Sequence, residues 1–438
     1  MGDPDSKKKR AIIGSLWTVM GFGGSQFVRL LSNLLLTRLL LPEVFGVMAL
    51  VQVVLQGLQM LSDAGISTSV VRSNQGDDPD YLNTAWTLQV IRGVLIWFVS
   101  CVLAYPMSII YEAPELLGLI PVVGFSAVIR GLNSSAVLSH RRHIHLKRII
   151  IWQLIGQILT TLITILAVWH YRSIWAIAMG GVVGALISCL LSYKLPKLTP
   201  TRFKLDHHAK ADILTFGQWI FVASFASFFI NKGDVFILGV SLSKAELGVF
   251  SIAAIWARLS LDLLLKINGQ VMTPIYSMAF RENPSSAIDK IRKARISLLA
   301  LALPMIWVLV MGSQYIIDLL YDPRYAGAGW MLQILAIGTI AAAITASSAN
   351  ALLVVGDSFG FMLFQLVRGL LLIICMSIGG SQFGIVGLIA GISVSKFVCY
   401  PALVVLLRKH SIWLPAIDCF AVGLSVVVLV IGFWWVHG

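Results

Sequence analysis

Eight lysine and arginine side chains lie inside long apolar stretches of this 438-residue sequence, each stretch long enough to cross a membrane. They are Arg29, Arg92, Arg130, Lys232, Arg258, Lys266, Arg368 and Lys396. A charged side chain at the centre of a bilayer costs about 2.5 to 3.5 kcal/mol on insertion scales, so it needs an internal partner, a hydrated cavity or an anionic ligand. Guanidinium groups bind phosphate and carboxylate oxygens as a bidentate fork. These cations therefore indicate an anionic substrate within the membrane.

Asp262 offers two of the cations a partner on their own helix. Arg258, Asp262 and Lys266 follow one another at intervals of four residues and share one helix face, where Asp262 can neutralise either neighbour. Arg258 lies nearer the middle of its segment and stays a candidate for substrate binding. Lys232 is too close in sequence to Asp234 to face it on a helix, but from a helix end its side chain can reach the interface. Lys232 and Lys266 therefore have adequate structural roles.

The other five cations have no obvious carboxylate partner, because Asp63 is the only acid near the N-terminal arginines and the segments of Arg368 and Lys396 contain none. Two interpretations remain open: these side chains line a hydrated basic cavity suited to phosphate or pyrophosphate, or they are buried and pair with backbone carbonyls. We expect the cavity. The predicted substrate-binding cations are Arg29, Arg92, Arg130, Arg258, Arg368 and Lys396. The acids available for ion coupling are Asp63, Asp234 and Asp262.

The composition shows what must position these residues. Hydrophobic residues make up 58% of the chain and charged residues only 12%, with a mean hydropathy of +0.87, which excludes a soluble domain. We predict an all-α polytopic membrane protein with about 12 to 14 transmembrane helices, at about 20 residues a span. The thirteen predicted spans are 11–40, 44–66, 83–107, 115–138, 146–170, 173–193, 211–240, 245–276, 294–320, 329–354, 358–378, 383–407 and 413–436.

Loop charges predict the orientation. With a cytoplasmic N-terminus, the cytoplasmic loops hold most lysine and arginine residues, including Arg295 near the start of span 294–320, whereas the opposite side holds few. The first apolar run has no A-x-A-like cleavage site and is expected to stay as an uncleaved helix. The net charge of +13 then reflects orientation in the membrane rather than nucleic-acid binding.

The sequence divides into two related halves. A hydrophilic linker at 193–212 separates six predicted spans from the next six, which gives lobes at 1–200 and 201–410 and an additional span at 411–438. Residues 42–47 resemble 244–249, and 133–138 resemble 348–353, at matching places in the two halves. We therefore expect a parallel repeat of two six-helix lobes around a cavity.

Motifs for chemical catalysis are missing from the sequence. Nothing matches a phosphate-cradling G-x-x-x-x-G-K-[ST] loop, and no loop is long enough for an independent domain. The five cysteines lie in apolar segments without C-x-x-C or Cys/His spacing. We expect no enzyme activity, no cofactor and no metal site.

Several short patterns resemble one family of transporters. They are LLLPEVFG at 39–46, LSDAG at 61–65, FGQW at 216–219, NKGD at 231–234 and YAGAGWMLQIL at 325–335. The chain resembles the Wzx-like bacterial polysaccharide exporters of the multidrug/oligosaccharidyl-lipid/polysaccharide (MOP) superfamily, of the colanic acid and succinoglycan type. The resemblance covers almost the whole chain.

This resemblance implies a V-shaped, two-lobe flippase in the bacterial inner membrane. Its substrate would be an undecaprenyl-pyrophosphate-linked oligosaccharide for exopolysaccharide or lipopolysaccharide O-antigen biosynthesis, moved by alternating access. The implied partners are this lipid-linked oligosaccharide, membrane lipids, a polysaccharide polymerase and other export proteins, without nucleic acid. Related flippases carry essential arginines on helices 1 and 8, where this sequence has Arg29 and Arg258.

Three other functions stay open. A drug/cation antiporter of the same superfamily conflicts with a positively charged interior, because such a cavity repels cationic drugs. A peptidoglycan-precursor flippase uses the same lipid pyrophosphate chemistry as the polysaccharide exporters. A polysaccharide polymerase or ligase would need a large outer loop, and every predicted outer loop is short.

Overall fold

A computed structural model of the chain describes residues 4–62, 65–73, 75–142, 146–196, 201–269, 284–355, 357–410 and 412–437. Across these ranges the regular structure is entirely helical, which confirms the predicted all-α fold. Within the described residues, nine helical segments are long and apolar enough to cross a membrane, and a tenth is added if α5 and α6 form one bent span. Each of the thirteen predicted spans overlaps a helical segment.

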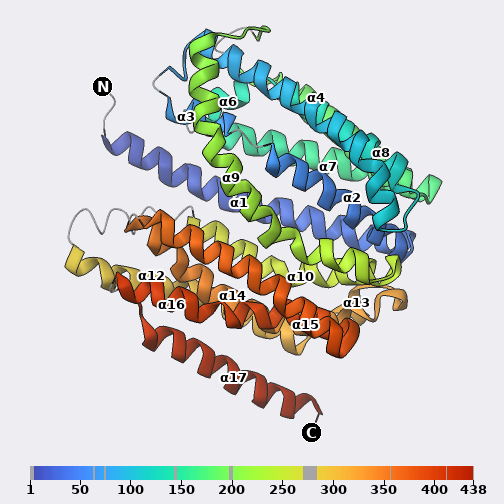
Figure 1. Cartoon of the computed structure of the whole chain (residues 1–438), viewed down its shortest axis with the longest axis vertical. Coiled ribbons are helices and arrows are strands. Elements are labelled where there is room, and N and C mark those ends of the chain that lie inside the picture. The colour runs from blue at the N-terminus through green and yellow to red at the C-terminus, as the bar shows by residue number, and fades with distance from the viewer. Residues whose placement is uncertain are drawn as a thin grey trace. The chain divides into compact units, whose positions relative to one another are not determined.

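The chain forms two compact units, Met1–Phe228 and Phe229–Gly438. Unit 1 contains α1 (Pro4–Leu39), α2 (Pro42–Leu61), α3 (Ile66–Arg72), α4 (Pro79–Ile110), α5 (Leu116–Gly131), α6 (Ala136–Arg142), α7 (Leu146–Tyr171) and α8 (Ile174–Ser192) (Figure 1). The helix α9 (His207–Ser241) begins in unit 1 and ends in unit 2. The sequence predicted one span at 115–138, whereas α5 and α6 meet there at an angle of 66°.

Two glycines bring α4 and α5 into close contact. A Cβ atom on Gly93 of α4 would lie 2.5 Å from the carbonyl oxygen of Ala127, and one on Gly131 of α5 would lie 2.9 Å from that of Gln89. Small residues of this kind let helix backbones approach closely in membranes. The polar side chains that flank the two glycines are therefore held near one another.

The segment that leads into α9 is fastened to α4. Its backbone N–H groups donate to side chains on the first three turns of this helix: Arg202 to Asn83, Lys204 to Thr87 and Asp206 to Thr84. The ammonium group of Lys204 also lies 2.7 Å from a carboxylate oxygen of Asp80, and this hydrogen bond raises the pKa of Lys204. The extended segment has no sheet to satisfy its backbone, and the helix supplies the acceptors instead.

Unit 2 is built around one central helix. It contains the end of α9 and α10 (Lys244–Ile267), α12 (Pro284–Met311), α13 (Ser313–Leu320), the 3-10 turn η2 (Pro323–Tyr325), α14 (Ala328–Val354), α15 (Ser358–Val398), α16 (Tyr400–Lys409) and α17 (Pro415–His437). In α14, 78% of the most apolar 18-residue stretch is buried, against 17% to 50% of the corresponding stretch in the other candidate spans. Helices α10, α12, α15, α16 and α17 pack around α14.

Helix α15 is a tight hairpin rather than one straight helix. Gly384 interrupts it with φ 58° and ψ −137°, a left-handed conformation that costs glycine little and other residues much more. On either side, a Cβ on Gly379 would lie 2.2 Å from the carbonyl oxygen of Gly387, so the two arms of the hairpin touch through their backbones. This break agrees with the two spans predicted at 358–378 and 383–407.

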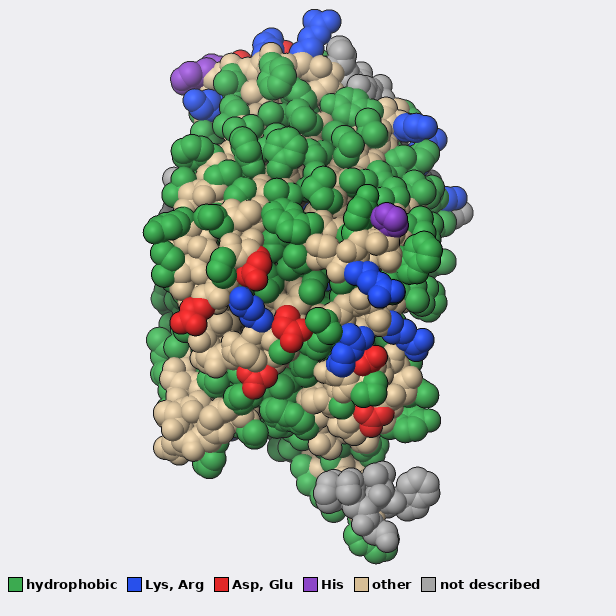
Figure 2. Space-filling model, turned by 90° about the vertical axis from the view of Figure 1, so that its right-hand side faces the viewer, with side chains coloured by type: hydrophobic (Ala, Val, Ile, Leu, Met, Phe, Trp, Pro, Cys, Tyr) green, Lys and Arg blue, Asp and Glu red, His purple; other side chains and the backbone are tan. Residues whose placement is uncertain are grey.

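Large apolar side chains cover much of the surface. Figure 2 shows hydrophobic side chains over most of the face in view, with charged groups gathered in restricted areas. Phe98, Leu166 and Val405 are 63%, 63% and 68% exposed. Such extensive apolar exposure is unfavourable in water and is expected where lipid replaces water. The protein is therefore a multi-pass membrane protein.

Candidate functional site

Unit 2 contains a cavity of about 160 Å³ that brings together five charged side chains from three helices. Helix α9 supplies Asp234, α10 supplies Arg258 and Asp262, and the two arms of α15 supply Arg368 and Lys396. The rest of the wall is mainly apolar, with leucine and alanine side chains predominating. The three cations outnumber the two acids in this cavity.

One ion pair organises the acidic side of this cavity. Nη2 of Arg258 donates to Oδ2 of Asp234 at 2.6 Å, and Oδ1 of Asp234 accepts from the backbone N–H of Val235 at 2.8 Å. The sequence suggested Asp262 as the neutralising partner of Arg258, one turn away. In the structure Arg258 pairs instead with Asp234, because α9 brings this buried carboxylate to it.

Arg368 and Lys396 face the cavity in a different way. In the part of the chain that the structure describes, neither side chain has an ion pair or a hydrogen bond, yet each is partly buried. They also line a smaller adjoining cavity of about 100 Å³ together with Gln365, Asn350 and Thr345. Cations in this situation need water or an anion.

Unit 1 has a basic cavity of its own, of about 240 Å³. Arg92 and Arg130 line it together with Gln59, Gln89 and Asn133. The guanidinium of Arg92 donates from Nε to Ser62 Oγ at 3.1 Å and from Nη2 to the carbonyl oxygen of Gln59 at 2.5 Å. Arg92 therefore lines a cavity and also pairs with a backbone carbonyl.

The remaining predicted site residues lie elsewhere. Arg29 is exposed on α1 and lines none of the cavities described above. Asp63 lies outside the described residues. No group of three or more His, Cys, Asp or Glu side chains that could hold a metal ion occurs among the residues whose positions are described.

Comparison with protein families identifies the chain's relatives. Residues 35–328 match the family model described as "Polysaccharide biosynthesis protein". The chain belongs to this family. The succinoglycan biosynthesis transport protein ExoT of Rhizobium meliloti (strain 1021) is 21% identical to the chain over 323 residues, which are 73% of this chain and 64% of ExoT. The match thus spans less than two thirds of ExoT.

Two solved structures share the fold of this polysaccharide biosynthesis protein. The lipid II flippase MurJ in an inward closed conformation gives a TM-score of 0.73 at 12% identity, covering 98% of this chain and 93% of MurJ. An inward-facing multidrug resistance MATE family transporter of the MOP superfamily gives 0.68 at 15% identity, covering 88% of this chain and 94% of that one. The family match confirms the resemblance to polysaccharide biosynthesis proteins that the sequence indicated, and the fold is that of MurJ and of a MOP-superfamily transporter.

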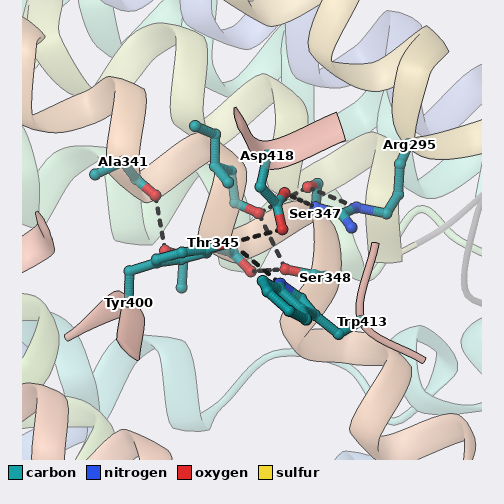
Figure 3. Close-up of polar contacts among 9 residues, drawn as sticks. Arg295, Ala341, Thr345, Ser347, Ser348, Tyr400, Trp413 and Asp418 are labelled. Atoms are coloured by element: carbon teal, nitrogen blue, oxygen red, sulfur yellow. Dashed lines mark hydrogen bonds and ion pairs between the residues drawn. The ribbon is translucent and has the colours of Figure 1, made fainter. Parts of the chain in front are cut away.

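In this family member the structure also reveals a buried cation that the sequence did not indicate. The sequence placed Arg295 in a cytoplasmic loop, but it lies inside α12 and is 1% exposed. Its Nη2 donates to Oδ1 of Asp418 at 2.5 Å, and its Nε donates to Ser347 Oγ at 3.3 Å. Tyr400 donates to the other oxygen of Asp418 at 2.6 Å (Figure 3).

The position of Arg295 in the helix was a usable signal. Ile291 lies one turn before it, and Leu298 and Leu299 lie one turn after it, so an apolar stripe runs through its position. Each of the three is buried. A cation on the apolar face of a helix, rather than at its charged end, predicts a buried partner.

Proposed function

We propose that this protein moves an undecaprenyl-pyrophosphate-linked oligosaccharide from the cytoplasmic to the periplasmic leaflet of the bacterial inner membrane, for exopolysaccharide or lipopolysaccharide O-antigen biosynthesis. Translocation proceeds by alternating access, without chemical conversion of the substrate, and the N-terminus is cytoplasmic. A polymerase and other export proteins use the product. Family membership and the flippase-like fold support this proposal.

The observation that carries the proposal is the pair of cations Arg368 and Lys396 in the cavity of unit 2. Pyrophosphate oxygens are strong acceptors that match an arginine fork and a lysine ammonium. Because Asp234 already pairs with Arg258, the two cations of α15 supply the positive charge that an incoming pyrophosphate meets. A cationic drug would be repelled there, which disfavours the antiporter.

Coupling to an ion is assigned to the acids of the same cavity. Asp234 is the stronger candidate, since an anionic substrate that engages Arg258 would compete with its carboxylate for the guanidinium. Asp262 lines the same wall. Substrate binding and ion binding would then be linked through Arg258. Arg29 and Asp63 remain predicted contributors.

The test is a translocation assay in proteoliposomes that contain the purified protein and a fluorescent lipid-linked oligosaccharide. The readout is the rate at which the glycan becomes accessible to a glycosidase added outside. Arg368→Ala and Lys396→Ala should each slow translocation at least about tenfold, since a lost charge-assisted hydrogen bond is worth about 1.5 to 3 kcal/mol.

The matched control is Lys409→Ala, which removes an exposed cation near the end of α16. Its rate should equal that of the wild type. Equal rates for all three variants would contradict the assignment of the cavity. A wild-type protein that translocates only the peptidoglycan precursor, or only a cationic drug, would contradict the proposed substrate.

A further inference from the structure

The cavity of unit 1 has a different chemical character from that of unit 2. Its wall consists of two guanidinium groups, three carboxamides, three small residues and one isoleucine, without a carboxylate among the described residues. The lining residues are Gln59, Gln89, Arg92, Gly93, Ile96, Ala127, Arg130, Gly131 and Asn133. This wall carries two positive charges and is rich in groups that both donate and accept hydrogen bonds.

Neighbouring helices hold part of this wall in a fixed arrangement. Arg92 is bonded to the end of α2 through Gln59 and Ser62. The amide of Gln89 donates to the carbonyl oxygens of Arg130 and Gly131 at 3.2 and 3.3 Å, so it ties α4 to the end of α5. Side chains that are fixed before a ligand arrives lose less conformational entropy when they bind it.

Two groups of the wall have hydrogen-bonding capacity that the described residues do not use. The guanidinium of Arg130 is exposed and has no hydrogen-bond or ion-pair partner among them. The buried side-chain Oδ1 of Asn133 has no donor in the described part of the chain either. The backbone carbonyl oxygen of the same residue accepts from Trp86 Nε1 at 2.9 Å. The guanidinium of Arg130 thus needs an anion, and Oδ1 of Asn133 needs a hydrogen-bond donor.

Phosphate alone does not satisfy this combination. An ionised phosphate ester offers acceptors but no donors, so it matches Arg130 and leaves the buried Oδ1 of Asn133 without a donor. Sugar hydroxyls donate and accept, as the amides of glutamine and asparagine do. A sugar that bears a carboxylate supplies both the anion and the hydroxyl donors.

We propose that this cavity binds a carboxylate-bearing sugar of the translocated glycan, with Arg130 and Arg92 on the carboxylate and Asn133 on a ring hydroxyl. Its volume of about 240 Å³ suits a small ligand such as one sugar unit rather than a chain. The inference rests on the proposed function and adds that the preferred glycan is acidic.

The experiment measures calorimetric binding of three probes to the purified full-length protein in detergent. Methyl glucuronide carries an anion and hydroxyls, methyl glucoside carries hydroxyls only, and pyrophosphate carries an anion only. Wild-type protein should bind glucuronide about tenfold more tightly than glucoside, the effect of one charged hydrogen bond. Arg130→Ala should remove this difference, and Arg130→Lys should keep part of it.

Asn133→Leu and Arg38→Ala complete the set of variants. Asn133→Leu should weaken the binding of both sugars severalfold and leave the binding of pyrophosphate at Arg368 and Lys396 unchanged. Arg38 is exposed on α1 and lines neither basic cavity, so Arg38→Ala should bind all probes as the wild type does. Because Arg130 is exposed, its variants should elute as folded protein.

Equal affinity of the wild type for glucuronide and glucoside would overturn the inference, and so would unchanged glucuronide binding in Arg130→Ala. The translocation assay separates this inference from the proposed function. Translocation with equal sugar affinities contradicts the acidic-sugar site alone. Selective, Arg130-dependent glucuronide binding without translocation of any lipid-linked glycan contradicts the proposed function alone.

Discussion

Of the arginine–aspartate pairs in unit 2, two have nearly the same bond length but different surroundings. Arg258 and Asp234 are joined at 2.6 Å, with side chains 36% and 10% exposed beside a cavity. Arg295 and Asp418 are joined at 2.5 Å, with side chains 1% and 3% exposed. Water or a ligand can reach the first pair and replace one of its partners. The second pair is shut off from water and ligands, and we call it the sealed pair. Access to the pair, not its bond length, separates a site from a structural clamp.

The sealed pair connects four helices. Arg295 belongs to α12, Ser347 to α14, Tyr400 to α16 and Asp418 to α17. Trp413 adds a bond to the hydroxyl of Tyr400 at 3.3 Å. Since α17 packs mainly on α12 and more sparsely on α14, this cluster anchors the last helix to unit 2.

The largest expected effect comes from breaking the sealed pair on one side. Arg295→Met leaves the carboxylate of Asp418 buried without its cation, which should lower the free energy of unfolding by about 3 to 5 kcal/mol. Chemical unfolding in detergent micelles measures this. Lys293→Ala, an exposed position two residues away, should change it by less than about 0.5 kcal/mol. A similar small change in Arg295→Met would contradict the structural role.

A second variant tests whether the loss comes from the unpaired charge. In Arg295→Met/Asp418→Leu no charge stays buried, so the double variant should regain about 1 to 3 kcal/mol relative to Arg295→Met alone. A double-mutant cycle on the free energy of unfolding gives this coupling. If the two losses simply add, the pair does not act as a unit.

A third pair, which is partly buried, should give a smaller and pH-dependent effect. His410 Nε2 lies 2.6 Å from Asp357 Oδ2, and this bond, together with the N–H of Gly360, holds the pKa of Asp357 below its usual value. Because the pKa of Asp357 is lower in the folded protein, its ionised carboxylate stabilises the fold at pH values above the unfolded pKa of about 3.9. This stabilisation is lost as the pH falls through the lowered pKa of the folded protein.

The measurement is the free energy of unfolding of the wild type and of Asp357→Asn from about pH 6 to about pH 3. Wild-type protein should lose its advantage over the variant as the pH drops. An advantage that persists or grows in acid would show that Asp357 is not held by His410.

The smallest effect on stability is expected at the cavity, together with a large effect on function. Arg368→Met removes a partly buried cation that has no partner among the described residues, so the free energy of unfolding should change by less than about 0.5 kcal/mol or rise. Translocation should still fall at least about tenfold. If Arg368→Met destabilises the protein as much as Arg295→Met does, then Arg368 has a structural role like that of Arg295 and the proposed difference between them is wrong.

Much of the fold followed from local properties of the sequence. Apolar length predicted the spans, because every backbone group in a membrane must be bonded within its own helix. The break between the spans of α15 was visible as a gap in the pattern, and Gly384 supplies it. The bend between α5 and α6 was not predicted, since apolar residues continue across it.

The site was predicted in part. The sequence alone identified Arg92, Arg130, Arg368 and Lys396 as cations without acids in their own segments, and these residues line two cavities. It determined the class, the family resemblance and the excess of positive charge, because these depend on residue type and on spacing within one helix.

Only the tertiary structure decided the partners. It joined Arg258 to Asp234 on another helix instead of Asp262 on its own, and it buried Arg295 against Asp418, 123 residues away. Ion pairs between helices depend on which helix faces pack together. A helix surrounded by lipid has apolar residues on nearly every side, so its sequence does not show which face packs against which neighbour. Which cations are clamped and which stay available for a ligand is therefore settled by packing.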